Sequence, residues 1–263
     1  LLASLVYGII EGPDAGWTSP EILGCFALSA LALTALIRYE PHRREPLIDL
    51  RFFRSAPFSG ATVIAVSAFA ALGGFLFLNT LYLQVARGMS PLHAGLYTLP
   101  MAAATAVFGP LSGRLVGRRG TRPSLIAGGI GMLVSALMLT SLSDTTGDAW
   151  LFTAYVVFGF GFGVINPPIT DTAVSGMPAA QAGVAAAVAS TSRQVGGSLG
   201  VALVGALAVP AATGAAGLTE AGHVGWWIIA GCGAIVVAVG ALSTTTWARA
   251  TAARTALALN PDP

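Results

Sequence analysis

Eight apolar stretches, separated by short polar breaks, run along this chain. A membrane-spanning helix needs about 20 mostly apolar residues, and seven of the stretches approach or exceed that length. The first is about half a span, so we expect one partial span followed by seven complete ones. It opens at Leu1 without a charged leader, which favours an N-terminally truncated chain over a signal peptide. The expected helices cover residues 1–10, 22–37, 58–81, 95–113, 123–142, 150–170, 183–209 and 224–247.

Composition agrees with this pattern. Of 263 residues, 55% are hydrophobic and 9% are charged. A soluble protein of this size would carry about 25% charged residues, so the sequence excludes a water-soluble domain. We therefore expect an all-α, polytopic membrane protein.

The charges indicate an orientation. If the stretches alternate in direction, all but two of the 13 basic residues fall on one side of the membrane. Arg87 alone falls on the other side, and Arg193 lies inside a stretch. Since arginines accumulate in cytoplasmic loops, the arginine-rich side and the C-terminus are predicted to be cytoplasmic, in the inner cell membrane. All five tryptophans, which favour membrane boundaries, fall at or just beyond the expected helix ends, at Trp17, Trp150, Trp226, Trp227 and Trp247.

The residues that several kinds of enzyme chemistry require are absent or unsuitably placed in this sequence. Every basic residue is arginine, so no lysine can serve a phosphate-binding loop or a Schiff base. The histidines lie in or beside expected loops, and Cys25 and Cys232 are isolated within apolar stretches. We expect no enzymatic activity, no cofactor, no metal and no nucleic-acid partner.

The segment between the second and third stretches differs from a plain connector. Residues 46–55 set Leu50, Phe52 and Phe53 among Asp49 and Arg51. Such a pattern can lie in the headgroup plane with arginines toward anionic lipid. An ordinary basic cytoplasmic loop explains it equally well.

The break from Gly109 to Arg122 reads GPLSGRLVGRRGTR. Glycines allow two helices to approach closely, and guanidinium groups can contact carboxylates or phosphates at helix ends. An anchor on the cytoplasmic side would explain the arginines alone. The ordered spacing of Gly113, Leu115, Arg118, Gly120 and Arg122 favours the close helix contact over a plain anchor.

This break resembles the loop signature of the major facilitator superfamily, G-x-L-x-D-R-x-G-R-[RK]. Gly117 stands where the signature has aspartate. The resemblance implies a conformational-switch loop that braces neighbouring helices, made of Gly113, Arg114, Arg118, Arg119, Gly120 and Arg122. Three other segments resemble more specifically the fourteen-span drug:proton antiporter branch. They are PLIDLRFFRSAPFSGA, YLQVARGMSPLHAGLYTLP and AGVAAAVASTSRQVGGSLGVALVGAL, at residues 46–61, 82–100 and 182–207.

The resemblance implies a domain plan. Residues 58–247 would form the C-terminal six-helix half of a major facilitator fold, and residues 1–40 the two linking spans. Residues 41–57 would be the cytoplasmic amphipathic loop and residues 248–263 a cytoplasmic tail. The N-terminal six-helix half would be missing from this chain.

The resemblance also implies a mechanism. Two six-helix halves would rock about a cavity at the midplane of the lipid bilayer, and would export small lipophilic or cationic molecules in exchange for protons. Glu11 and Asp171 lie near expected helix ends, so we expect the proton-coupling carboxylates in the missing half.

Arg193 is the one charge well inside a stretch. Because a buried guanidinium is costly in lipid, it could line the inner cavity or a gate, with Asp171 as a possible charge partner. A snorkelling interfacial arginine is an equal alternative. Further substrate-path candidates are amides, each of which could instead form an interhelical hydrogen bond: Asn79, Gln84, Asn166 and Gln194.

Small residues predict tight packing in two stretches. Glycine permits close backbone contact, and proline bends a helix in lipid. We expect such contacts and bends at Gly159, Gly161, Gly163, Pro167, Pro168, Gly196, Gly197, Gly200 and Gly205.

Three alternatives to a proton-coupled exporter remain open. A metabolite uniporter or symporter of the same fold would keep every motif and differ only in cavity residues. A half-transporter could act as a homodimer. A non-transporting membrane scaffold would retain the packing glycines without a substrate path.

Overall fold

The computed structural model describes residues 1–39, 49–143, 145–174, 181–208 and 214–259, and these fold only into helices and short connections. Leu47 and Ile48 of the expected amphipathic loop lie outside the described residues. The α-helices are α1 (Leu2–Ala15), α2 (Pro20–Tyr39), α3 (Ala56–Leu81), α4 (Pro91–Tyr97), α5 (Leu99–Arg119), α6 (Arg122–Leu139), α7 (Asp148–Val174), α8 (Ala182–Ala208), α9 (Gly214–Ser243) and α10 (Thr246–Leu259). A 3₁₀ turn, η2 (Leu50–Arg54), precedes α3, and a π-helical turn, η3 (Tyr82–Ala86), follows it.

Every expected stretch is helical. Within the described residues, six helices are long and apolar enough to cross a membrane. They are α2, α3 with η3, α4 with α5, α6, α7 and the described part of α9. Helix α8 is 27 residues long and continuous, but it is not among the six, because the polar residues from Ser190 to Gln194 lower its mean hydropathy. The chain is an all-α, polytopic membrane protein.

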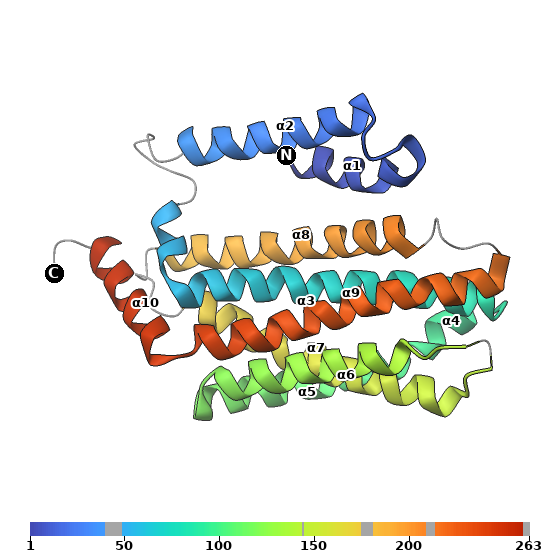
Figure 1. Cartoon of the computed structure of the whole chain (residues 1–263). Coiled ribbons are helices and arrows are strands. Elements are labelled where there is room, and N and C mark those ends of the chain that lie inside the picture. The colour runs from blue at the N-terminus through green and yellow to red at the C-terminus, as the bar shows by residue number, and fades with distance from the viewer. Residues whose placement is uncertain (40–48, 144, 175–180, 209–213, 260–263) are drawn as a thin grey trace.

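Contacts between the long helices follow a twofold pattern (Figure 1). Helix α3 packs against α8 and α9, whereas α7 packs against α5 and α6. In addition, α3 contacts α7, and α6 contacts α9. The triplets α3–α5–α6 and α7–α8–α9 therefore make equivalent contacts, as in a bundle built from two three-helix repeats.

Helices α1 and α2 form a hairpin against one side of this bundle. The two helices are joined by a hydrogen bond between the hydroxyls of Ser4 and Ser29, at 2.8 Å. In Figure 1 the hairpin lies alongside α8, and the contacts between the bundle and the hairpin run mainly from α8 to α1. The hairpin thus leaves α5, α6 and α7 on the far side of the molecule.

Glycines set the distance between neighbouring helices. A Cβ atom on Gly161 of α7 would lie 2.6 Å from the carbonyl oxygen of Gly128 in α6. Likewise, a Cβ on Gly200 of α8 would overlap the carbonyl of Ala70 in α3. No larger side chain fits at such positions, as the sequence predicts. An added Cβ would also be too close to its neighbours at Gly159, Gly163 and Gly196. At Gly205 the Cβ would make only ordinary contact, and at Gly197 it would have no atom within 4 Å.

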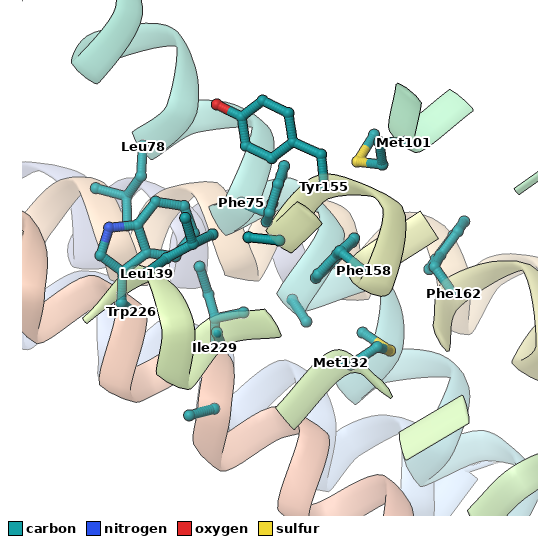
Figure 2. Close-up of a cluster of buried hydrophobic side chains, with 14 of the residues drawn as sticks. Phe75, Leu78, Met101, Met132, Leu139, Tyr155, Phe158, Phe162, Trp226 and Ile229 are labelled. Atoms are coloured by element: carbon teal, nitrogen blue, oxygen red, sulfur yellow. The ribbon is translucent and has the colours of Figure 1, made fainter. Parts of the chain in front are cut away.

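The core between the triplets is aromatic (Figure 2). Phe75 of α3 stacks on Phe158 of α7, with ring centroids 4.2 Å apart. Tyr155 and Trp226 contact the same ring edge-on, at 5.6 and 5.5 Å. Offset and edge-to-face pairs add about 0.5–1.5 kcal/mol each beyond area burial. Trp226, which the sequence predicts at a membrane boundary, is buried in this cluster and so faces the bundle, not lipid.

Several boundaries differ from the prediction, two of them beside arginines. Helix α5 continues through Arg119, since arginines in a last helical turn interact favourably with the helix dipole. The last expected stretch ends early at Ser243, and residues 246–259 form the separate helix α10.

Within η2, Phe52 is buried against Phe58, with ring centroids 5.6 Å apart, so it does not face lipid headgroups.

Candidate functional site

A cavity of about 720 Å³ lies between α1, α3 and α8. Its walls combine apolar side chains with a few polar ones, and its volume is that of a pocket for a drug-sized molecule. The lining includes Val6, Ile10, Phe69, Arg193, Gln194 and Ser198. Helix α8 supplies every charged or amide group among these residues.

Arg193 is held by two helices other than its own. Its Nη2 donates a hydrogen bond to the hydroxyl of Thr170 in α7, at 2.6 Å. Its guanidinium carbon lies 5.8 Å from the centre of the Phe69 ring in α3, within cation–π distance. Arg193 forms no ion pair within the described residues. The expected partner Asp171, one position beyond Thr170, is exposed and forms no ion pair with Arg193.

The four amides occupy different surroundings. Gln194 lines the cavity. Asn79 is buried, and its Oδ1 accepts a hydrogen bond from the Tyr155 hydroxyl inside the aromatic core. Asn166 donates to the carbonyl of Phe162 within α7, at 3.1 Å. Gln84 is half-buried in the π-helical turn η3. Of the substrate-path candidates, only Arg193 and Gln194 share this cavity.

The candidate switch loop is mostly helical. Gly113, Arg114, Arg118 and Arg119 lie in the second half of α5, and Arg122 begins α6. Gly120 ends α5 with φ of 76°, a left-handed conformation that favours glycine. The four arginines are all exposed, and a Cβ at Gly113 would meet nothing within 4 Å. The motif therefore makes a sharp helix reversal without close helix contact.

A polar network closes the opposite end of the bundle. Arg87, which follows η3, pairs with Asp148 of α7 at 2.7 Å and also donates to the Thr146 carbonyl. Its Nε donates to the Tyr82 hydroxyl at 3.1 Å, and Tyr97 of α4 donates to Asp148 at 3.0 Å. The side chain of Arg87 is only 12% exposed. This network joins the α3, α4 and α7 segments.

A second junction ties α10 to the start of α3. Arg51 of η2 pairs with Asp49 at 2.6 Å and donates to the carbonyl of Ala258 in α10, at 3.1 Å. The hydrogen bond from the Arg51 side chain is the main cause that holds the pKa of Asp49 below its usual value. Below that lowered pKa, protonation of Asp49 would remove the pair.

Two of these residues are not predicted from the sequence as functional. A threonine near a helix end, such as Thr170, carries no signal until the α7–α8 contact is known. Arg87 indicates only the orientation of the chain. Its isolation on the arginine-poor side, together with nearby Tyr82 and Tyr97, is the one signal for the network.

Long apolar helices in two equivalent triplets, with a mixed cavity beside them, make this a polytopic helical membrane protein built from two three-helix repeats. Comparison with known families agrees: the family model described as Major Facilitator Superfamily matches residues 2–201. The chain belongs to the Major Facilitator Superfamily.

Its relatives include proteins named for resistance and export. The chain is 34% identical over 206 residues to the multidrug resistance protein Stp of Mycobacterium tuberculosis (78% of this chain, 38% of the relative). It is 38% identical over 207 residues to the tetracenomycin C resistance and export protein of Streptomyces glaucescens (77% and 38%). A methylenomycin A resistance protein of Streptomyces coelicolor is 33% identical over 213 residues (78% and 43%). The chain thus spans less than half the length of these relatives.

Proposed function

We propose that this chain forms one wall of a secondary active transporter that exports small lipophilic molecules by alternating access. The carrying observation is the cavity of about 720 Å³ beside α8, at a helix that packs on α3 through glycine contacts. Close glycine contacts of this kind hold α8 and α3 together, so that the bundle can rock as one rigid body against a partner unit. The relatives named for resistance and export support efflux as the direction.

The opposite wall would be a second six-helix unit. The chain covers 38% of two of its relatives, which leaves room in them for such a unit. In this proposal residues 58–247 are one half of the transporter, residues 1–40 a linking pair and residues 41–57 an amphipathic loop. The arginine-rich end, which in Figure 1 carries α10, would face the cytoplasm, with residues 248–263 as a cytoplasmic tail of an inner-membrane protein.

The helix reversal at Gly120 would act in the switch. Four exposed arginines at the ends of α5 and α6 are free to engage carboxylates or lipid phosphates of a neighbouring unit when the halves rock. Arg118→Ala together with Arg119→Ala is then expected to slow transport while substrate affinity stays within about threefold.

Exchange for protons would be coupled through the second unit. Among the acidic residues whose side chains the structure describes, each lies near a helix end or in a turn, away from the middle of the bundle: Glu11, Asp14, Glu21, Asp49, Asp148 and Asp171. A coupling carboxylate at membrane depth would therefore come from the partner wall.

Transport in proteoliposomes tests the proposal. The full-length protein, reconstituted with an imposed proton gradient, should drive uptake of a fluorescent lipophilic dye, and a protonophore should abolish it. Dye movement that ignores the protonophore would refute proton coupling. Competition by polar metabolites and not by lipophilic compounds would identify a uniporter or symporter, and no movement of any solute would leave a scaffold.

A further inference from the structure

We infer that the cavity beside α8 recognises an anionic group on an amphiphilic small molecule, with Arg193 as its charge partner. This inference rests on the proposed transport function and specifies the substrate class that the cavity accepts. It replaces the expectation of a cationic substrate for this wall of the cavity.

Arg193 lies well inside helix α8. Arg193 is the twelfth of 27 residues in α8, so its Cα lies about 16 Å along a helix of about 40 Å. An arginine that only snorkels would extend along its helix into water. The Arg193 guanidinium instead contacts Phe69 of α3 and Thr170 of α7, across the bundle.

Within the described residues, this charge lacks a counter-charge. Its described partners are a neutral hydroxyl and an aromatic ring. Its Nε is buried without a hydrogen-bond partner in the described part of the chain. A partly buried guanidinium is stabilised by a negative group beside it, and an anion bound in the cavity would supply one.

The walls of the cavity combine hydrogen-bond donors with an apolar surface. The Thr170 bond and the Phe69 ring fix the guanidinium plane, which prepares its free N–H groups for a carboxylate, sulfonate or phosphate oxygen. Gln194 and Ser198 line the same cavity and can donate further hydrogen bonds. The α1 wall supplies Val6 and Ile10 for an apolar body. A carboxylate joined to an apolar body fits both parts, whereas a cation would face Arg193.

Binding of a matched pair of ligands tests the inference. We would titrate the purified full-length protein, in a neutral detergent, with 4-butylbenzoate and with 4-butylbenzyl trimethylammonium, which differ in charge at similar size. The acid should bind at least about tenfold more tightly than the cation, the difference expected for one charge-assisted contact. Arg193→Gln should weaken the acid by about tenfold and leave cation affinity within about threefold.

Further variants separate recognition from misfolding. Arg193→Lys should retain part of the preference, because the charge remains while the planar fork is lost. Thr170→Val, which removes the hydroxyl that positions the guanidinium, should weaken the acid by less than Arg193→Gln does. Arg254→Gln removes an exposed arginine of α10 far from the cavity and should change neither affinity.

Three results would overturn the inference. One is equal binding of acid and cation by the unaltered protein, and another is an acid preference that survives Arg193→Gln. The third is phospholipid that co-purifies with the unaltered protein but not with Arg193→Gln, without acid binding, which would assign the anion to a lipid headgroup. Binding does not require turnover, so failed transport with an intact acid preference would refute only the proposed function.

Discussion

Replacing Gly161 by alanine is the most direct test of the packing in this bundle. The added Cβ would lie 2.6 Å from the carbonyl oxygen of Gly128 and 2.6 Å from the amide nitrogen of Met132. Ordinary contact begins at 3.4 Å, so α6 and α7 must separate by about 0.8 Å. Both contacting atoms belong to the helix backbone, which cannot rotate away as a side chain can.

The expected cost follows from two opposing terms. Overpacking of a close interface costs about 1–3 kcal/mol, whereas replacing glycine by alanine within a helix contributes up to about 1 kcal/mol. The separation also stretches the hydrogen bond from the Ser135 hydroxyl to the Ala154 carbonyl, now 2.7 Å, at the same interface. We expect a net loss of about 1–2 kcal/mol, which corresponds to a melting temperature lower by about 2–8 °C.

Gly231→Ala is the matched control. Gly231 also lies inside a long helix, α9, but a Cβ there would meet nothing within 4 Å. The melting temperature in detergent, followed by tryptophan fluorescence, should therefore stay constant or rise in this variant. Equal effects of the two substitutions would refute the argument that backbone contact at Gly161 fixes the α6–α7 spacing.

Three further predictions concern stability, each checked by the same melting experiment. Arg87→Gln should lower the free energy of unfolding by about 2 kcal/mol, because a mostly buried guanidinium loses its charge-assisted hydrogen bonds. The loss should be equally large in high salt, whereas a loss that disappears in high salt would indicate an exposed ion pair. Tyr155→Phe should cost about 1–3 kcal/mol, since it leaves the buried Asn79 oxygen without a donor, and no change would mean that this oxygen is satisfied otherwise. Phe52→Ala should lower the free energy of unfolding by about 3 kcal/mol and speed hydrogen exchange in α10, because Phe52 is buried in a cluster with Leu259. Phe53→Ala should have neither effect, because Phe53 is 43% exposed. A larger effect at Phe53 than at Phe52 would contradict the burial of Phe52.

The positions of the helices could be predicted from the sequence because lipid imposes one requirement on every span. Each backbone polar group must be satisfied within its own helix, so an apolar run of sufficient length becomes a helix. The glycines of α7 and α8 could be predicted for a similar reason, because close contact in lipid selects the smallest residue. Their actual partners, such as Gly128 and Ala70, depend on which helices pair.

The surroundings of individual polar residues could not be predicted, since they depend on contacts between distant segments. Arg193 contacts Thr170, 23 positions away in sequence, and forms no ion pair with the neighbouring carboxylate of Asp171. Asn79 looks like a cavity residue in sequence but is buried beside Tyr155. Trp226 carries the composition signal of a membrane boundary, yet the bundle buries it.

The helix ends illustrate a third limit. Charged residues at the end of a span can continue a helix, as the arginines after Gly113 do, or can follow a break, as those after Thr245 do. Hydropathy treats both cases alike. The distinction comes from tertiary contacts such as the hydrogen bond from the Ala56 amide to the Thr251 hydroxyl, at 2.9 Å, which fixes α10 against the start of α3.

Alternating access makes one measurement decisive. Ser198 is exposed on α8 and lines the cavity, so a single cysteine at this position, with Cys25 and Cys232 replaced by alanine, would report which side of the membrane reaches the cavity. In oriented vesicles of the full-length protein, a membrane-impermeant maleimide should label Ser198→Cys from one side without substrate and from the other in its presence under a proton gradient. Labelling from the same side at the same rate under all conditions would contradict a moving wall of a transporter.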